Sequence, residues 1–488
     1  MPQRLIDVHA HVFNLGYVPV QGILQSRGAP KILAVLVAKI LEGALEREES
    51  LPRSMVEWIA QDKRRDRPEL DGITEFVQSA SPAFLEAHAR DIHEAARRAD
   101  ADMKRRATKS QIAQLRAEAA RVFPRLEPLP RADLRKGLWD LLKKLAKLLD
   151  DGHALVEWLL LLLSKETRLV ETLNLAWPES DLFVHHMMDM DSFYAGHPLY
   201  PFLDLQLRRM RVLSERSGGR LLTFVAYDPF RSDAVDIIRR ELHNGCAGVK
   251  FYPPSGYRPI GNTTDDLKGT GQDPDVINCR NTELFALCTK LNVPILAHCS
   301  RGGMERVPKK TGELSDPSAW RTVLHSFNEL RLCLGHAGGD DGWCAPRTKK
   351  GEKVFADSFA MKVISLCSDA NYPNVYCEFG HTERLFDETS RANFAGRLGE
   401  VARNGADGER FLTRVMYGSD WHLLARVQQY AGFDDIFRDI FRADKVLAPH
   451  AERFFRGNAL QFLNLPAYVR RNDKVLTSEE KRYLNSLA

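Results

Sequence analysis

Short apolar runs and amphipathic segments alternate along most of the chain. The apolar runs have the length and composition of β-strands, and turn residues bound them. Eight such runs occur, at residues 4–12, 181–187, 220–228, 245–253, 292–299, 330–338, 374–380 and 414–420. Segments with helical spacing lie between consecutive runs, for example at residues 233–244 and 280–292. This alternation predicts a (β/α)8 barrel. The competing doubly wound sheet usually begins with a glycine-rich turn, and none follows the first run.

Residues 14–178 have a different pattern. They are rich in Ala, Leu, Arg and Glu at helical spacing, with few β-branched runs. The chain is therefore predicted to comprise a first barrel strand (1–13), an all-helical insertion (14–178), the rest of the barrel with a closing helix (179–465) and a polar C-terminal tail (466–488). Because the insertion follows the first strand, it emerges at the mouth of the barrel, and we expect it to form a lid.

The insertion also carries a basic amphipathic stretch. In residues 133–150 the leucines share one helical face, while lysines and arginines avoid it. Residues 97–147 hold 15 Lys and Arg against 6 Asp and Glu. Such a helix can bind an anionic membrane surface or an acidic partner. A helix that packs on the core and exposes its basic face to solvent is the simpler interpretation.

Chemically active side chains stand at the carboxyl ends of the predicted strands. In RLIDVHAHVF (4–13), Asp7, His9 and His11 are two residues apart, so they share one face of a regular strand. Later strands end in a second set, comprising Lys250, His298, His336 and Asp420. The carboxyl ends of barrel strands form the active site in enzymes of this architecture, so we expect these side chains to meet.

Four stretches resemble the amidohydrolase superfamily, specifically its amidohydrolase-related (amidohydrolase 2) branch. They are DVHAH at strand one, VPILAHC at strand five, LRLCLGHAGG at strand six and RVMYGSDW at strand eight. The segment RFFRGNALQFLNL (453–465) is similar to the family's terminal helix, which packs back on the barrel. The resemblance covers residues 1–13 and about 180–465, and it does not extend to the insertion.

The resemblance implies a metal-dependent enzyme. The implied ligands of one divalent ion are His9, His11, His298 and Asp420. Imidazole and carboxylate ligands suit Zn²⁺, the preferred ion, and also Mn²⁺ or Fe²⁺. Asp420 would also accept a proton from the activated water, and His336 would act as acid or base or polarise the substrate oxygen. We expect Asp7 to orient one imidazole.

Lys250 leaves the number of ions open. In binuclear members of the superfamily a strand-four lysine is carboxylated and bridges two ions, and the strand-five and strand-six histidines hold the second ion. The corresponding residues here are His298 and His336. The phrase GVKFYPP also resembles the mononuclear branch, where this lysine would bind a substrate anion or a structural carboxylate. One ion is the preferred prediction.

Weaker candidates follow the strand ends. Tyr252, Arg258 and Arg301 could contact a carboxylate or a ring of the substrate. Each of these residues is explained equally well as a loop residue that packs or is solvated. The same holds for a further group of candidates: Tyr257, Gly302, Glu378, His381, Trp421 and His422. The adjacent His185 and His186 face opposite ways in a strand, so at most His186 is expected to line the pocket.

Composition narrows the class of protein. The chain is 44% hydrophobic and 27% charged, as expected of a soluble globular protein. A net charge of +4 on 488 residues does not suggest nucleic-acid binding. The eight cysteines form no CxxC pair, and the apolar runs suit neither a signal peptide nor a membrane span. We therefore expect free thiols and a cytoplasmic location.

The leading functional hypothesis is a metal-dependent hydrolase that cleaves an amide, ester or lactone bond. Its rival is a non-oxidative decarboxylase that acts on an aromatic or unsaturated carboxylic acid at the same metal site. A third hypothesis treats the barrel as a scaffold and the insertion as a membrane- or partner-binding element. The expected partner is a small carbonyl compound or carboxylate, and the sequence is compatible with a homo-oligomer.

Overall fold

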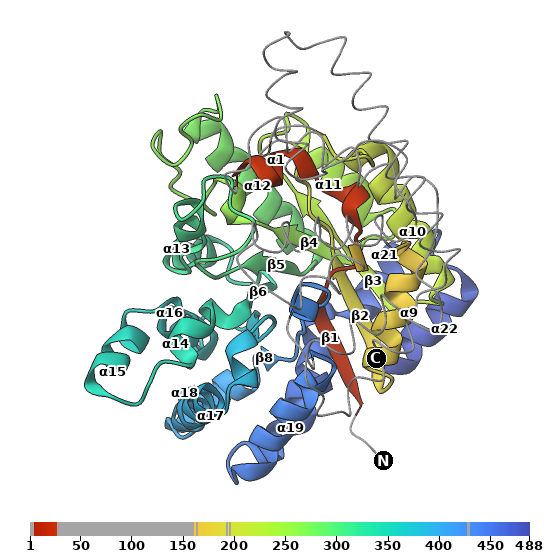
Figure 1. Ribbon diagram of the computed structural model, residues 1–488. Helices are drawn as coiled ribbons and strands as arrows, with labels where there is room; N and C mark the ends of the chain where they lie inside the picture. Colours follow the sequence, from red (N-terminus) through yellow and green to blue (C-terminus); the bar gives the residue numbers. More distant parts are fainter. Residues whose placement is uncertain (1–3, 27–160, 163, 192–193, 195–196, 427–429) are drawn as a thin grey trace, which may run out of the picture.

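A parallel barrel forms the centre of the protein. The computed structural model describes residues 4–26, 161–162, 164–191, 194, 197–426 and 430–488. The strands pair in sequential order. They are β1 (Leu5–Ala10), β2 (Ser180–His186), β3 (Leu221–Tyr227), β4 (Gly248–Phe251), β5 (Ile295–His298), β6 (Leu332–Gly335), β7 (Val375–Glu378) and β8 (Val415–Met416). β8 reaches β1 through hydrogen bonds from Val8 N to Tyr417 O (3.2 Å) and from Asp420 N to His9 O (2.6 Å). The sheet is a nearly closed (β/α)8 barrel, which confirms the predicted architecture (Figure 1).

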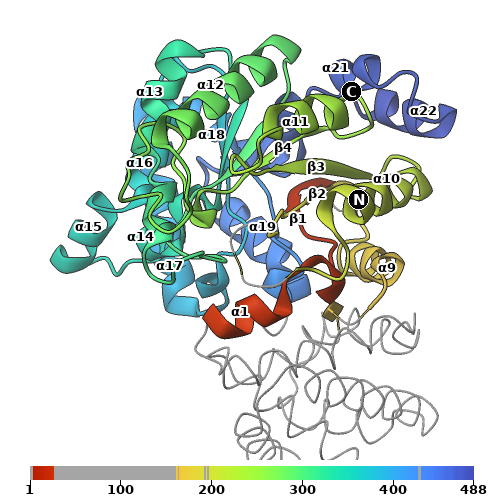
Figure 2. The ribbon, with the colours of Figure 1, turned by 90° about the horizontal axis from the view of Figure 1, so that it is seen from above.

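Helices follow the strands and surround the barrel (Figure 2). They are α10 (Leu207–Arg216), α11 (Ala234–Leu242), α12 (Pro274–Leu291), α13 (Ser318–Ser326), α14 (Asp340–Trp343), α15 (Lys349–Ala356), α16 (Phe359–Ser368), α17 (Glu388–Ala402), α18 (Gly405–Leu412) and α19 (Phe433–Ala443). The helix predicted at 280–292 begins earlier, because Asp273 caps it by accepting a hydrogen bond from Asp275 N (2.8 Å) and Pro274 suits its first turn. It ends at Leu291, and the following Asn292 adopts a left-handed conformation (φ 52°).

The strands' two faces bury two apolar clusters. Outward-facing side chains such as Val249, Ile295 and Leu334 pack against the surrounding helices. Inside the barrel the apolar side chains are Ile6, Val8, Leu182, Val184, Leu222, Phe224, Leu296, Cys333, Tyr376 and Met416. This interior cluster lies towards the amino ends of the strands, which leaves the carboxyl ends for polar side chains.

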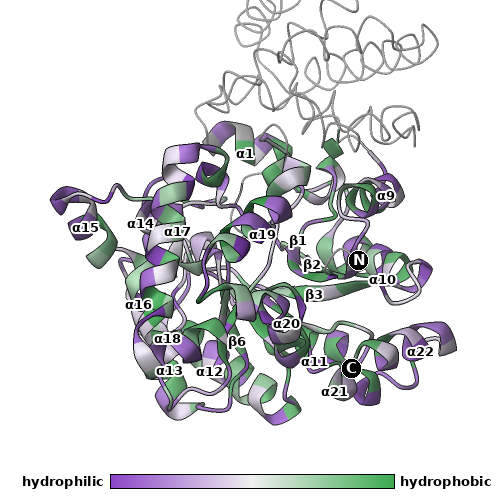
Figure 3. Ribbon diagram, turned by 90° about the horizontal axis from the view of Figure 1, so that it is seen from below, coloured by the Kyte–Doolittle hydropathy of each residue, from purple (hydrophilic) through white to green (hydrophobic). Residues whose placement is uncertain are grey.

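The C-terminal segment closes the amino end of the barrel. Helices α20 (Asn458–Leu463), α21 (Leu465–Arg471) and α22 (Ser478–Leu487) contribute Phe462, Tyr468 and Leu484 to the interior cluster. Both hydrophobic and hydrophilic residues occur along these helices, as expected where one face of a helix is buried (Figure 3). Residues 466–488, predicted as a polar tail, therefore contain two helices that pack against the barrel.

Both ends of the insertion are described and lie side by side. After β1 come a 3-10 turn, η1 (Leu15–Tyr17), and α1 (Val20–Ser26), and α9 (Glu166–Ala176) precedes β2. The Tyr17 hydroxyl donates to Glu166 Oε1 (2.8 Å), and the Asn14 amide donates to Ser164 O (3.1 Å). The basic helix at 133–150 and most of the predicted lid lie outside the described residues. None of the helices in the described part is long and apolar enough to cross a membrane.

Candidate metal centre

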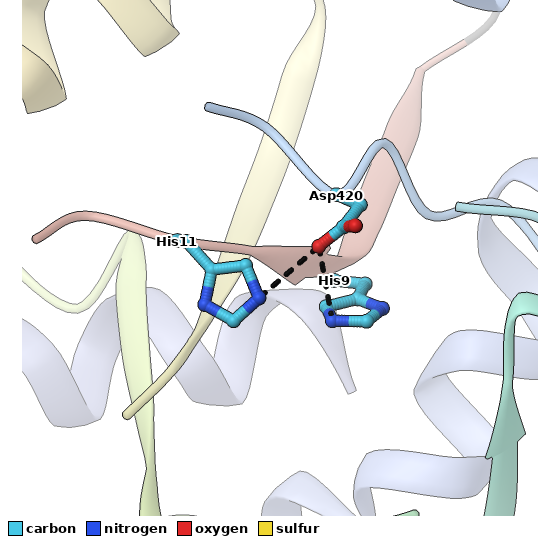
Figure 4. Close-up of side chains that lie close together, drawn as sticks. All are labelled: His9, His11 and Asp420. Atoms are coloured by element: carbon cyan, nitrogen blue, oxygen red, sulfur yellow. Dashed lines mark ion pairs between the residues drawn. The ribbon is translucent and has the colours of Figure 1, made fainter. Parts of the chain in front are cut away.

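Two histidines of β1 and one aspartate after β8 meet at the carboxyl end of the barrel. His11 Nε2 lies 3.1 Å from Asp420 Oδ1, and His9 Nε2 lies 3.3 Å from the same oxygen (Figure 4). All three side chains are buried. They form one of two groups among the described residues whose ligand atoms are close enough to hold a metal ion together. The geometry therefore agrees with the expectation from sequence that His9, His11 and Asp420 lie close together.

The outer nitrogens of the two imidazoles have fixed partners. His9 Nδ1 lies 2.8 Å from Glu378 Oε1, and His11 Nδ1 lies 2.8 Å from the backbone oxygen of His186. A carbonyl or carboxylate oxygen accepts only, so each Nδ1 carries the proton. Burial lowers the pKa of both imidazoles, which favours their neutral form. In that form the Nε2 lone pairs of both rings face Asp420.

Asp420 adds a third acceptor at the same point. Burial alone would raise the pKa of its carboxyl, whereas protonation of the neighbouring histidines, His11 above all, would hold that pKa well below its usual range. Its Oδ1 is buried without a hydrogen bond from any described residue. Two imidazole lone pairs and a carboxylate oxygen thus converge. Lys250 Nζ lies 2.9 Å from His9 Nε2, whereas Asp420 Oδ1 lacks a hydrogen bond, so a cation would satisfy the acceptors that remain.

The spacing of these atoms fits a divalent ion. Nitrogen and oxygen ligands lie about 2.0–2.2 Å from Zn²⁺ in tetrahedral sites, so two ligand atoms are separated by about 3.3 Å. The separations from Asp420 Oδ1 are 3.1 Å and 3.3 Å. The donor set therefore suits a catalytic metal.

His298, the fourth ligand implied by the resemblance, faces His336. Its Nδ1 lies 3.1 Å from His336 Nε2, and its Nε2 lies 3.0 Å from both Gly302 O and Ser300 Oγ. His336 Nδ1 lies 2.9 Å from Gly380 O. Because both outer nitrogens face carbonyl oxygens, the inner nitrogens of two neutral rings would meet as acceptors. One shared proton, or a cation, would satisfy this pair.

Lys250 lies between these two sets of groups. Its Nζ is 2.9 Å from His9 Nε2, and the side chain is buried without an ion pair to any described carboxylate. Burial lowers its pKa to about 8, although Asp420 and Glu378 act in the opposite direction. Both predicted roles, contact with a substrate anion and carboxylation, remain predictions.

Asp7 does not orient an imidazole, contrary to the sequence-based expectation. Its carboxylate accepts hydrogen bonds from Ser419 Oγ (2.6 Å), Ser419 N (3.0 Å) and the backbone N–H of His9 (3.0 Å). The cause is a β-bulge: between Asp7 and Ala10, β1 has one residue more than the paired part of β2. The alternation shifts, so Asp7 does not share a face with His9.

Glu378 takes the place expected for Asp7. It ends β7, and its carboxylate contacts His9 Nδ1 as well as the backbone N–H of His336 (2.7 Å). Sequence reasoning named it only as a weaker candidate. The sequence feature that points to Glu378 is the same as for the other site residues: an ionisable side chain at the carboxyl end of a barrel strand.

The three candidate substrate contacts differ in position. The Tyr252 ring lies 4.9 Å from that of His298, and its hydroxyl accepts a hydrogen bond from Met304 N (2.6 Å). Arg258 forms two hydrogen bonds with Asp266 (3.0 and 3.1 Å). Arg301 pairs with Glu313 (2.9 Å) and is largely exposed. Tyr252 alone among them contacts a histidine of the site.

The backbone around the site is strained. Left-handed conformations occur at His336 (φ 61°), Ala337 (φ 44°), His381 (φ 60°) and Asp420 (φ 58°), just after β6, β7 and β8. Such conformations are uncommon for residues other than glycine, and they concentrate at functional sites. His381 Nδ1 also lies 3.5 Å from Asp420 Oδ2.

Comparison with known proteins identifies the family. The family model described as amidohydrolase matches residues 195–465, more than half of the chain, so the protein belongs to the amidohydrolase family. Membership indicates a metal-dependent enzyme on a TIM barrel. No match was found among curated proteins.

The solved structures that are similar to this chain are distant. One is a putative metal-dependent hydrolase from Lactobacillus casei (12% identity, TM-score 0.42, covering 96% of this chain and 97% of that one). Another is an amidohydrolase from Burkholderia multivorans with bound zinc (10%, TM-score 0.38, 59% and 84%). A third is 5-carboxyvanillate decarboxylase from Sphingomonas paucimobilis (12%, TM-score 0.37, 62% and 84%).

Proposed function

We propose that the protein is a metal-dependent hydrolase that cleaves an amide, ester or lactone bond of a small carbonyl compound. The observation that carries this proposal is the convergence of His9 Nε2, His11 Nε2 and Asp420 Oδ1, three buried ligand atoms of which Asp420 Oδ1 has no hydrogen bond from a described residue. These residues would hold one divalent ion, Zn²⁺ by preference, and His298 would join them. A bound ion would polarise the carbonyl and make water more acidic.

The remaining groups of the site suit proton transfer. Asp420 would accept the proton of the attacking water through its carboxylate. The pair of His298 and His336, whose inner nitrogens are 3.1 Å apart, can hold a proton for the leaving group. Lys250 and Tyr252 border these residues and would contact the substrate. Arg258 and Arg301 would need to leave their carboxylate partners before they could bind a substrate anion.

Non-oxidative decarboxylation is the second candidate, and the same imidazole pair favours it. Loss of carbon dioxide from an aromatic or unsaturated acid leaves a carbanion, which must receive a proton at carbon. A proton shared by His298 and His336 would be available for that step. Lys250 would bind the carboxylate of the substrate.

Metal analysis and product analysis test the proposal together. Purified protein should contain one divalent ion per chain, and dialysis against a chelator should abolish turnover until the ion is restored. A panel of amides, esters and lactones should yield products with one water added. Release of carbon dioxide from aromatic acids, with no hydrolysis across the panel, would instead select decarboxylation. Two ions per chain would assign Lys250 a bridging role, and absence of metal binding would overturn the proposal.

The other sequence predictions extend this proposal. We propose a cytoplasmic enzyme, either monomeric or homo-oligomeric, in which the 14–178 insertion forms a lid over the carboxyl end of the barrel. The described ends of the insertion, at Asn14 and Ser164, are joined by a hydrogen bond (3.1 Å), so the insertion leaves and returns at one place.

A further inference from the structure

Glu378 is a fully buried carboxylate at the end of β7. Its Oε1 lies 2.8 Å from His9 Nδ1 and accepts a hydrogen bond from His336 N (2.7 Å). Its Oε2 accepts a hydrogen bond from Gly380 N. One side chain therefore links β1, the residue after β6 and the turn after β7.

No arginine or lysine in the described part of the chain forms an ion pair with Glu378; its one ion-pair partner there is His9. Glu480, an equally buried carboxylate in α22, instead has Arg211 on both oxygens, at 3.0 and 3.1 Å. A buried carboxylate without a cationic side chain is costly unless its donors are well placed. Its donors belong to the candidate metal centre, which argues for a role there.

Three glycines make room for this carboxylate. A Cβ at Gly418 would lie 2.5 Å from Glu378 Oε2, and one at Gly380 would lie 2.7 Å from the same oxygen. A Cβ at Gly335 would lie 3.2 Å from Oε1. Any larger residue at the first two positions would displace Glu378, because real Cβ atoms do not approach so closely. The ends of β6, β7 and β8 are thus shaped around Glu378.

We propose that Glu378 is the positioning residue of the metal centre: it fixes His9 with the proton on Nδ1, so that Nε2 faces Asp420, and it sets the position of His336. The inference rests on the proposed function. Carboxylates that hold the outer nitrogen of a ligand histidine fix its tautomer and strengthen its binding. Glu378 also forms, with His9 and His336, the second group of described residues whose ligand atoms lie close together. We assign it to positioning because its oxygens already accept from His9, His336 and Gly380.

Two substitutions separate position from charge. Glu378→Gln keeps the shape, but one end of its amide is a donor, so it cannot accept from all three N–H groups. Glu378→Asp keeps the charge, but its shorter side chain cannot reach His9 and Gly380 together. Both should weaken Zn²⁺ binding by about 10–100-fold while one ion per chain still binds at saturation. The measurement is competition with a chromophoric chelator, which needs no substrate.

The control is Glu480→Gln, which removes a buried carboxylate at the opposite end of the barrel. It should lower the melting temperature without changing the Kd for Zn²⁺. If a Glu378 variant fails to fold, Gly335→Ala crowds the same carboxylate, because a Cβ there would lie 3.2 Å from Oε1 and meets no proposed ligand. Gly335→Ala should weaken Zn²⁺ binding, whereas the control Gly396→Ala, whose Cβ meets nothing within 4 Å, should not.

Each outcome decides the inference. Wild-type affinity in Glu378→Gln would overturn it, and so would full rescue by Glu378→Asp, which would indicate a role for charge alone. Loss of the ion as complete as in His9→Ala would make Glu378 a ligand and overturn the positioning role. A wild-type protein that binds no divalent ion would overturn the proposed function itself, so the two failures are distinguishable.

Discussion

The two ends of the barrel bury carboxylates in opposite ways. At the amino end, Arg211 donates to both oxygens of Glu480 (3.0 and 3.1 Å), and Arg456 donates to Asp181 (3.0 Å). At the carboxyl end, Asp420 and Glu378 meet imidazoles and backbone N–H groups, and no described arginine or lysine pairs with them. The first arrangement is complete, whereas the second leaves Asp420 Oδ1 without a donor.

The difference shows how a barrel separates stability from chemistry. A guanidinium carries five N–H groups and has no lone pair. In an arginine–carboxylate pair it can therefore donate hydrogen bonds to the carboxylate, but it can neither bind a metal nor accept a proton. An imidazole held through one nitrogen keeps the other nitrogen free to bind a metal or carry a proton. The left-handed residues after β6, β7 and β8 add strain at the carboxyl end, which the packed amino end can support.

The largest effect expected at the carboxyl end is loss of metal binding. His9→Ala combined with His11→Ala removes two of the three converging acceptors, so we expect purified protein with no bound divalent ion. The strands should still form, because the apolar clusters are untouched. Elemental analysis after dialysis measures the ion, and circular dichroism checks the fold. His243→Ala, at the exposed end of α11, is the control, and an unchanged ion content in the double variant would refute the metal centre.

The next largest effect is a loss of turnover on substitution of Asp420, which is proposed both to bind the ion and to accept a proton. Asp420→Asn keeps one oxygen ligand but has no basicity near neutral pH. Loss of a general base costs about 10²–10⁴ in rate, so kcat should fall by at least that range while substrate affinity is largely kept. The comparison uses enzyme saturated with metal. Asp341→Asn, an exposed carboxylate in α14, is the control. Near wild-type turnover would move the role to His336.

At the amino end the expected effect is on stability alone. Arg211→Ala leaves Glu480 buried without its cation, and breaking such a pair costs about 3 kcal/mol of the free energy of unfolding. Urea denaturation measures this loss. Arg301→Ala removes an exposed pair with Glu313 and should cost less than about 1 kcal/mol. Zn²⁺ affinity should be unchanged in Arg211→Ala, and a weakened affinity would show that the two ends are coupled.

The sequence predicts the carboxyl end of the barrel better than the amino end. The eight strands follow from apolar runs of strand length, and topology then brings His9, His11 and Asp420 to one end. Helices α21 and α22 were missed because residues 466–488 are mostly polar, although Leu476, Leu484 and Leu487 supply a buried face. Short amphipathic helices of this kind gain most of their stability from packing, which composition does not reveal.

Within the site, sequence reasoning identifies residue types better than their pairing. It predicts Asp7 as the partner of an imidazole because it assumes regular alternation in β1, whereas the partner of His9 is Glu378. A bulge of one residue in β1 reverses that inference. The space for Glu378 depends on glycines at the ends of β6, β7 and β8. The residues implied by the resemblance remain predictions as ligands, and His298 faces His336 rather than the converging acceptors.

The smallest expected effect is a change in how stability depends on pH. His185 is the penultimate residue of β2 and lies near His11, and burial lowers its pKa well below the ordinary value of about 6.5. Its Nδ1 accepts a hydrogen bond from Val12 N (2.8 Å), which protonation would break. In the unfolded chain this imidazole binds a proton below pH of about 6.5, whereas in the native state it stays neutral. The unfolded state then holds more protons, so stability falls as pH falls below that value.

His185→Asn isolates this contribution, because the amide oxygen can still accept from Val12 N while the side chain no longer titrates. Each proton bound only by the unfolded state adds about 1.4 kcal/mol per pH unit to the slope of the unfolding free energy. Between pH 6 and pH 5 the variant should therefore lose stability less steeply than the metal-free wild type, by roughly that amount. His243→Asn, at an exposed side chain that follows α11, is the control. Equal slopes for His185→Asn and wild type would mean that His185 binds its proton in the native state too, and the carboxyl end would then tolerate a buried charge that its contacts do not support.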